Sequence, residues 1–473
     1  MNIKGLSFYL SLSCFPVCFF SFINILYSLY FDYFLSLDSY IITLILSFLV
    51  GVFFYFFGKS SLKKIRFIEQ ITLVLLVYFL ISFFISIPYY LSNYQITFIN
   101  SYFEAISGVT GTGFTIFENI KYLDPTLILW RSSSQWIGGL YFLIFIILFF
   151  SNSQFNYKLN SLVNGNDKKV NPENDIKDIT VKIFFLYFIL TILIFVLLSM
   201  SDLRLFNSLN LSMTLVSAGG FLPTNNLGQI IKTGPQESVL IFSFLLAILN
   251  ISFIYNLFIK KNILKDNYED FYIILLCTIF SIIFYLLINN SNFLEVSINV
   301  LSSISTSGLS ISENISKKFS LYFLFLTIMG GSLISNTSGI KFLRIYILLK
   351  ASFIEIFKLV KPNNIINQNI LITNIKINNN NIKLSFLVFI SFFISLFILS
   401  SLIMLDNISF ENAFKLSILT ITNTTLSNIY GVDFIDFSNL LTFSKSTIII
   451  FMIIGKIELI SFFLIIKNII TKN

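Results

Sequence analysis

A stretch of small and polar residues in the first quarter of the chain has the composition needed to bind a dehydrated cation. The stretch is Ser107–Ile120, SGVTGTGFTIFENI, in which Thr110, Gly111, Thr112 and Gly113 alternate threonine and glycine. Glycine permits backbone angles that other residues avoid, so successive carbonyl oxygens can turn toward one axis. Rings of such oxygens replace the water around an ion that leaves solution. The pattern predicts one side of a carbonyl-lined ion site.

Three later stretches have the same character, each starting as a short helix and ending in small polar residues. They read LRLFNSLNLSMTLVSAGGF, NFLEVSINVLSSISTSGL and ISFENAFKLSILTITNTTLSNIYGV. Irregular backbone at membrane depth is tolerated only where protein or a water-filled cavity surrounds it. Four such loops therefore predict one central pore, with the negative ends of the short helices favouring a cation. The alternative is that the glycines and serines only let membrane helices pack closely.

The elements that would hold these loops are membrane spans, because 56% of the 473 residues are hydrophobic and 11% are charged. A span takes about 20 apolar residues. Ten candidate spans are Leu6–Phe31, Tyr40–Phe57, Gln70–Tyr90, Thr126–Phe150, Thr180–Met200, Glu237–Ile259, Phe271–Ile288, Leu321–Leu349, Leu384–Leu405 and Ser446–Ile466. We expect an all-α polytopic membrane protein with about ten transmembrane helices. The first span has Pro16 and no small-residue cleavage site, so we expect it to be retained.

The basic residues predict the orientation of these spans. If every span crosses, most of the 31 Lys and Arg fall on one side. By the positive-inside rule that side is cytoplasmic and carries both termini. The net charge of +8 then reflects topology more than a nucleic-acid surface.

The absence of histidine from the sequence excludes Ser-His-Asp catalysis. Cys14 and Cys18 lie one helical turn apart without a histidine or carboxylate nearby, which makes a poor metal site, and Cys277 is alone in another span. We therefore expect no enzyme and no organic cofactor.

One candidate span is interrupted by GGSLISNTSG, the segment Gly330–Gly339. Glycine and small hydroxyl residues disfavour helix, so we expect helix to be lost there. The alternative is a kink whose backbone groups neighbouring helices satisfy.

Several motifs together resemble the Trk/Ktr/HKT superfamily of potassium uptake proteins, and within it the bacterial Trk-type membrane subunit. They are FEAISGVTGTGFTIF (Phe103–Phe117), WRSSSQWIGGLYFLIF (Trp130–Phe145), VSAGGF (Val216–Phe221), STSGL (Ser305–Leu309), IMGGSLISNTSGIKFLR (Ile328–Arg344) and IGKIE (Ile454–Glu458). The resemblance covers essentially the whole chain in the same order.

The resemblance implies four pseudo-repeats of helix, pore hairpin and helix around one pore, preceded by two further N-terminal helices. The implied division is 1–60 for these two helices, then 61–152, 153–260, 261–352 and 353–473 for the repeats. The implied filter residues are Thr110, Gly111, Thr112, Gly113, Ser217, Ala218, Gly219, Thr306, Ser307, Gly308, Asn428, Ile429, Tyr430 and Gly431. Potassium is expected at Thr112, Gly113, Ala218, Gly219, Ser307 and Gly308. In the family, a glycine in the first loop goes with potassium selectivity, and Gly113 is the corresponding glycine here.

The fourth loop departs from the family pattern of Asn, an apolar residue and Gly-Pro-Gly. This chain has Asn428-Ile429-Tyr430-Gly431-Val432, so either Tyr430 takes the glycine position or the strand shifts to use Gly431. Partial sodium permeation is then a hypothesis.

The resemblance also implies a gate in the pore below the filter. Its expected residues are Gly330, Gly331, Ser335, Asn336, Thr337, Ser338, Gly339 and Lys456. Lys456 stands where the family usually has arginine, as a fixed charge that Glu458 could pair with. The implied assembly is a homodimer in the lipid of the bacterial plasma membrane, with a separate cytosolic nucleotide-binding regulatory subunit and no nucleic acid.

We therefore expect potassium uptake, driven by the membrane potential. The alternatives are a sodium/potassium-permeable or sodium-coupled transporter of the same fold, a secondary transporter of another fold, a membrane-embedded enzyme, and a non-conducting relative. The four same-sense modules and the scarcity of mid-span charge disfavour the secondary transporter of another fold.

Overall fold

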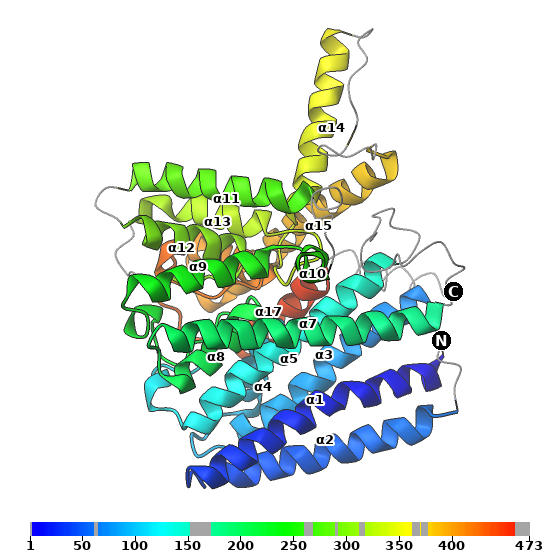
Figure 1. Cartoon of the computed structure of the whole chain (residues 1–473), viewed down its shortest axis with the longest axis vertical. Helices are drawn as coiled ribbons and strands as arrows, with labels where there is room; N and C mark the ends of the chain where they lie inside the picture. The colour runs from blue at the N-terminus through cyan, green and yellow to red at the C-terminus, as the bar shows by residue number, and fades with distance from the viewer. Residues whose placement is uncertain are drawn as a thin grey trace.

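The computed structural model describes residues 2–60, 65–151, 172–259, 268–288, 292–311, 317–361, 369 and 377–458, which are mostly helical. Helices α1 (Ile3–Tyr30) and α2 (Leu37–Gly58) pack against each other at the edge of the bundle (Figure 1). The expectation of an all-α membrane protein is confirmed by these elements.

Four units follow, each with a long helix, a short helix and a further helical element. This last element is one helix in the first and fourth units and a pair of helices in the second and third. The first has α3 (Phe67–Tyr90), α4 (Phe98–Thr110) and α5 (Pro125–Ser151), and the second α7 (Pro172–Met200), α8 (Leu205–Val216), α9 (Gly234–Ile248) and α10 (Ile251–Ile259). The third has α11 (Tyr268–Leu287), α12 (Phe293–Ile304), α13 (Ser320–Met329) and α14 (Phe342–Val360), and the fourth α15 (Asn379–Ile403), α16 (Phe410–Ile421) and α17 (Thr442–Ile457). The predicted boundary at 352 falls inside α14.

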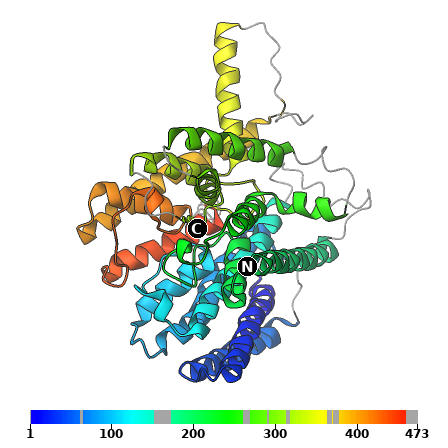
Figure 2. The ribbon, with the colours of Figure 1, turned by 60° about the vertical axis from the view of Figure 1, so that its left-hand side comes forward.

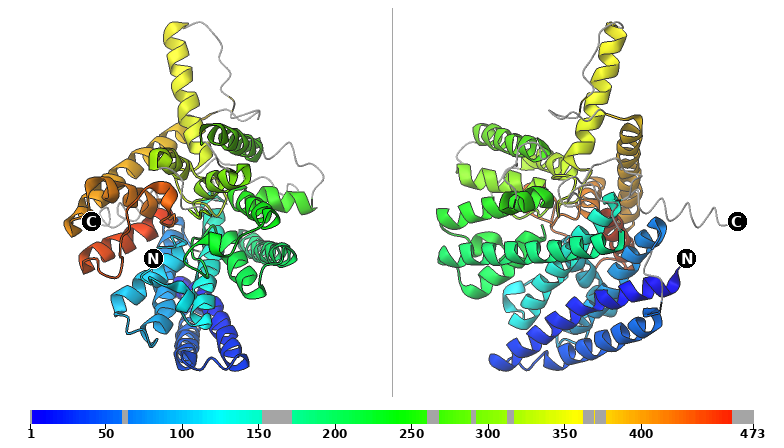
Figure 3. Two further views of the ribbon diagram at one scale, coloured as in Figure 1. Left: turned by 90° about the vertical axis from the view of Figure 1, so that its left-hand side faces the viewer. Right: turned by 45° about the vertical axis from the view of Figure 1, so that its right-hand side comes forward.

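The four units close into a ring in chain order. Helix α5 of the first unit contacts α8 of the second, α9 contacts α12, α13 contacts α16, and α17 returns to α4. The left panel of Figure 3 looks along the bundle and shows the units arranged around a common centre, with α1 and α2 outside the ring. Figure 2 shows the same arrangement obliquely. The first unit therefore lies opposite the third, and the second opposite the fourth.

Six helices within the described residues are long and apolar enough to cross a membrane, namely α1, α2, α3, α7, α11 and α15, the last measured together with the turn that follows it. A seventh span results if the bent pair α9 and α10 counts as one. The other three expected spans correspond to α5, to the interrupted pair α13 and α14, and to α17, which ends beside the limit of the described residues. The number of ten spans stays a prediction.

The expected span Glu237–Ile259 is not straight. Helices α9 and α10 meet at 113° across Leu249 and Asn250. Two contacts hold the bend, one from α11 and one from the chain between α13 and α14. Asn250 N donates to Asp270 Oδ1 at 2.8 Å, and Ile251 N donates to Ile334 O at 3.0 Å. Asn250 and Ser252 are the only polar residues in an otherwise apolar stretch around the bend, so hydropathy averaged over the span gives no sign of it.

Candidate ion pathway

Each of the four short helices ends in a turn of the same shape. At this turn one residue donates its amide to the carbonyl three residues earlier and has a positive φ. These residues are Gly111 (φ 79°), Ala218 (55°), Thr306 (59°) and Asn423 (50°). Their backbone N–H groups donate hydrogen bonds to the carbonyl oxygens of Gly108, Leu215, Ser303 and Thr420, respectively. A positive φ is uncommon outside glycine and asparagine. Its recurrence at Ala218 and Thr306 fixes a common register for the four loops.

Counted from that residue, four five-residue segments are equivalent, and we call them turn segments one to four. They are Thr110–Phe114, Ser217–Phe221, Ser305–Leu309 and Thr422–Leu426. Each starts with a hydroxyl residue and ends with an apolar one. In three of them the first hydroxyl bonds to the hydroxyl of the third residue, at 2.7 Å for Thr110 and Thr112, 3.0 Å for Ser305 and Ser307, and 2.9 Å for Thr422 and Thr424.

The fourth position of the turn segments brings all four units into contact. Its occupants are Gly113, Gly220, Gly308 and Thr425. A Cβ atom added to Gly113 would lie 2.8 Å from Gly220 Cα and 2.9 Å from Thr425 Cβ. A Cβ added to Gly308 would lie 2.6 Å from Thr425 O. The turn segments therefore converge at the centre of the ring.

The predicted filter residues of the first three loops all lie in turn segments one to three. The register differs by one in the second, since Gly220 and not Gly219 is level with Gly113 and Gly308. A Cβ added to Gly219 would lie 2.3 Å from Gln135 Oε1, so this face of Gly219 packs on α5.

The predicted residues Asn428–Gly431 lie beyond the fourth turn segment, in a short 3-10 helix (Asn428–Tyr430) and the residue after it. Tyr430 is buried, with its hydroxyl 3.4 Å from Ser303 Oγ of α12. Gly431 O accepts from Lys415 Nζ at 2.9 Å. Tyr430 and Gly431 therefore pack beside the loops and not among the turn segments, while Asn428 lines the hollow above them.

Sequence reasoning missed Gly220 and the whole fourth turn segment. The fourth turn segment is TNTTL and contains no glycine, so an assignment based on glycine selects Gly431 further along the chain. The signal available was the pattern of a hydroxyl residue, three positions of turn and an apolar residue, with Asn423 at the left-handed position.

An outer hollow of about 430 Å³ opens onto the turn segments. It is lined by residues of all four units, including Gly113, Gly220, Gly308 and Thr425, and by the carboxylates Glu118 and Asp436. Of the other acidic residues near the loops, Asp124 accepts a bond from Ser36 Oγ and Asp433 accepts one from Asn412, while Glu313 lies outside the described residues.

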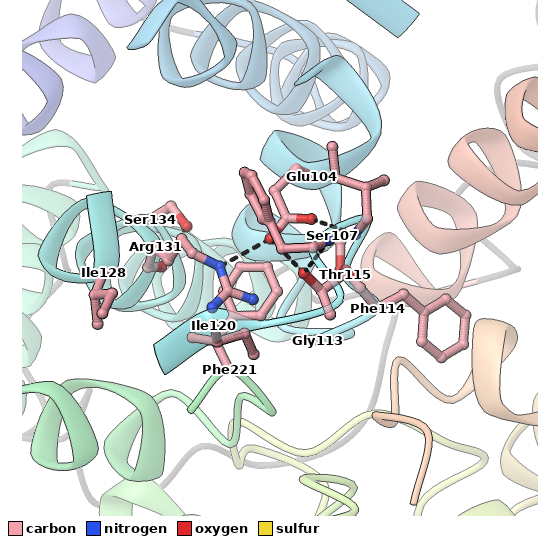
Figure 4. A network of polar contacts seen from close by, with 12 residues as sticks. Glu104, Ser107, Gly113, Phe114, Thr115, Ile120, Ile128, Arg131, Ser134 and Phe221 are labelled. Atoms are coloured by element: carbon pink, nitrogen blue, oxygen red, sulfur yellow. Dashed lines mark hydrogen bonds and ion pairs between the residues drawn. The ribbon is translucent and has the colours of Figure 1, made fainter. Parts of the chain in front are cut away.

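A buried ion pair supports the first turn segment from behind (Figure 4). Arg131 Nε donates to Glu104 Oε1 at 2.9 Å, and both side chains are buried. The same carboxylate accepts from Ile116 N at 2.9 Å and Thr115 Oγ1 at 3.1 Å. The Arg131 guanidinium also lies 4.1 Å from the ring centroid of Phe221. This network joins the chain after the first turn segment to the end of the second.

Below the turn segments, helix is lost between α13 and α14, over the loop Gly330–Lys341. The loop is buried and bonded to turn segments and helices above it. Ser338 N donates to Thr306 Oγ1 at 3.0 Å, and Asn336 Nδ2 donates to Val216 O at 2.6 Å. The expected interruption is thus present, and two of its polar groups bond to the second and third turn regions.

Two buried lysines lie at this loop. Lys456 Nζ is 3.6 Å from where a Cβ on Gly111 would be, and 3.4 Å from Asn336 O. Lys341 Nζ donates to Ser335 O at 3.2 Å and to Thr337 O. Glu458 pairs with Arg344 at 2.6 Å, so the described contacts give it a partner other than Lys456.

Membrane-length helices combined with four converging hairpins are the arrangement expected of a polytopic ion-transport protein. A family model described as TrkH, cation transport protein, matches residues 38–265. The match spans just under half of the chain, which is therefore similar to the Trk cation transport proteins.

Individual relatives are similar over most of their length. An uncharacterized cation transporter of Methanocaldococcus jannaschii is 26% identical over 419 residues, covering 82% of this chain and 84% of the relative. The Trk system potassium uptake protein TrkG of Escherichia coli is 24% identical over 442 residues, covering 90% of each. The crystal structure of the potassium transporter TrkH from Vibrio parahaemolyticus has the same fold, with a TM-score of 0.83 at 17% identity over 98% of both chains.

Proposed function

We propose that this chain conducts potassium across a membrane through the centre of its four turn segments. The observation that carries the proposal is the contact among Gly113, Gly220, Gly308 and Thr425 at the floor of the outer hollow. Backbone and hydroxyl oxygens there can replace an ion's water. The membrane potential supplies about 2.3 kcal/mol per charge per 100 mV. The names of the TrkG and TrkH relatives support potassium as the ion.

The proposed filter comprises Thr110–Gly113, Ser217–Gly220 and Thr306–Gly308. Its potassium ligands lie at the third and fourth positions of these turn segments, with Gly220 in place of the expected Ala218: Thr112, Gly113, Gly219, Gly220, Ser307 and Gly308. The fourth quarter is assigned to Thr422–Thr425, because this segment has the same turn and the same position in the ring as the other three. Asn428–Gly431 is left outside the filter.

The proposed gate is the loop Gly330–Lys341 together with Lys456. Its contacts with Thr306 and Val216 support a position directly below the filter. An ammonium group close to Gly111 opposes a passing cation, by about 4 kcal/mol at 4 Å for an effective dielectric constant of 20. Movement of this loop would relieve the barrier.

The similarity to Trk proteins also supports the assembly and location expected from the sequence. The chain acts as a homodimer in the bacterial plasma membrane, with both termini in the cytoplasm. A cytosolic nucleotide-binding subunit regulates it, and the chain itself catalyses no reaction.

Growth of potassium-uptake-deficient cells at low external potassium tests this function. Wild type should restore growth, and Gly113→Ala should abolish it, because Gly113 has φ 79° and no room for a Cβ. Gly234→Ala is the matched control, since its Cβ would meet only Leu294 Cδ1 at 3.9 Å. No rescue by wild type present in the membrane, or full rescue by Gly113→Ala, would refute the pore.

A further inference from the structure

Thr425 is the one side chain at the level where the other three turn segments have glycine. Its unit lies opposite the second unit in the ring, so Thr425 faces Gly220 across the centre. A Cβ added to Gly220 would lie 2.4 Å from Thr425 Cβ, 2.9 Å from Cγ2 and 3.0 Å from Oγ1. The threonine side chain therefore stands across the pathway and touches the glycine opposite.

The hydroxyl of Thr425 also donates a hydrogen bond to a carbonyl oxygen of a neighbouring turn segment. Oγ1 donates to Gly113 O at 3.0 Å, and both groups are buried. A carbonyl oxygen that accepts this bond has less capacity left to coordinate an ion. The φ of Thr425 is not positive, so the backbone accommodates threonine there without strain. The equivalent glycines Gly113 and Gly308 do have positive φ, at 79° and 71°.

Both contacts disfavour a large monovalent cation more than a small one. The Cγ2 methyl narrows the ring, which penalises potassium more than the smaller sodium ion. The occupied Gly113 carbonyl lowers the number of oxygens that can surround the larger ion. Three glycine positions and one threonine therefore discriminate less between the two ions than four glycines would.

We propose that Thr425 is the specificity-determining residue of this pathway, a side-chain constriction that limits potassium flux and admits sodium beside potassium. This inference rests on the proposed function, because it requires conduction through the turn segments.

The test is flux through purified full-length protein in lipid vesicles, with potassium and sodium measured separately for wild type, Thr425→Gly, Thr425→Ser and Thr425→Val. Thr425→Gly should raise potassium flux and the potassium-to-sodium ratio by about two- to tenfold, the range that loss of one hydrogen bond produces. Thr425→Ser keeps the hydroxyl without the methyl, and Thr425→Val keeps the shape without the hydroxyl. Each should give a smaller rise than glycine.

Tyr430→Phe is the control for the alternative fourth quarter, since it removes only the hydroxyl near Ser303. It should leave flux and ratio unchanged. Unchanged selectivity in Thr425→Gly, or in Thr425→Ser where glycine prevents folding, would overturn the role of Thr425. A shift in Tyr430→Phe with none at Thr425 would also overturn it. Failure of the pore itself gives a different result, in which folded wild type and all variants pass neither ion.

Discussion

Gly138 of α5 lies directly against the carbonyl oxygen of Val109 near the end of α4, and a Cβ on Gly138 would be 1.8 Å from that oxygen. The fourth unit repeats the relationship, because a Cβ on Gly455 of α17 would be 2.2 Å from Ile421 O at the end of α16. Val109 and Ile421 each lie two residues before the left-handed residue of their turns. Helices α5 and α17 thus pack closely against the ends of α4 and α16 because each has a glycine at the contact.

Gly138→Ala should lower the free energy of unfolding by about 1–3 kcal/mol or more, the range typical of overpacking, because the added methyl would clash with backbone that cannot rotate away. Thermal unfolding in detergent, followed by tryptophan fluorescence, measures the effect. Gly234→Ala, whose Cβ would make only an ordinary van der Waals contact with Leu294, should unfold at the wild-type temperature. Equal unfolding temperatures for Gly138→Ala and wild type would show that α4 and α5 can separate freely.

Glu104→Ala should cost about 3–5 kcal/mol, because it leaves Arg131 buried without its ionic partner. It also removes the acceptor for Ile116 N, so the first turn segment should lose its position and the protein its ion preference. Unfolding temperature and ion flux are both measured. Glu355→Ala is the comparison, since its pair with Lys358 is exposed and such pairs contribute about 0–1 kcal/mol. If the two substitutions proved equally mild, Glu104 would have no positioning role.

The sequence was sufficient to locate the four hairpins and the interrupted helix, because small polar residues inside apolar surroundings have few other structural uses. It was insufficient for the register of the loops. Gly219 and Gly220 are adjacent and chemically identical in the sequence. They are distinguished only by contacts in the folded chain, since Gly219 N donates to Thr214 O while Gly220 packs against Thr425. Contacts between distant segments, such as that of Asp270 with Asn250 at the α9 bend, leave no local pattern.

Lys456→Met should raise the resting flux of potassium by at least about tenfold, since a tenfold change corresponds to only about 1.4 kcal/mol of the electrostatic barrier. The methionine side chain keeps most of the packing against Phe142, whose ring centroid lies 4.5 Å from Lys456 Nζ. Lys445→Met is the matched control on the same helix, because Lys445 bonds Asn100 and Ser438 away from the loop Gly330–Lys341. Vesicle flux at fixed membrane potential provides the comparison. A rise in both variants would assign the effect to net charge and not to the position of Lys456.

Removal of Ser332–Ser338 should likewise raise resting flux, because this part of the loop carries the bonds to Thr306 and Val216. The same vesicle assay applies, with protein amount and folding checked by gel filtration. Flux equal to wild type in folded protein would exclude the loop as the gate.

Glu269 of α11 holds the loop Gly330–Lys341 in place from the side, since its Oε1 accepts from Leu333 N at 2.9 Å. Adjacent loop residues are joined to the bent inner helix of the second unit, where Ser332 N donates to Ile248 O at 3.0 Å. Glu269→Ala should free the loop and raise resting flux several-fold, roughly the effect of one lost hydrogen bond. Glu269→Gln retains an acceptor oxygen and should stay closer to wild type. If alanine and glutamine raised flux equally, the charge of Glu269 and not its bond to Leu333 would control the loop.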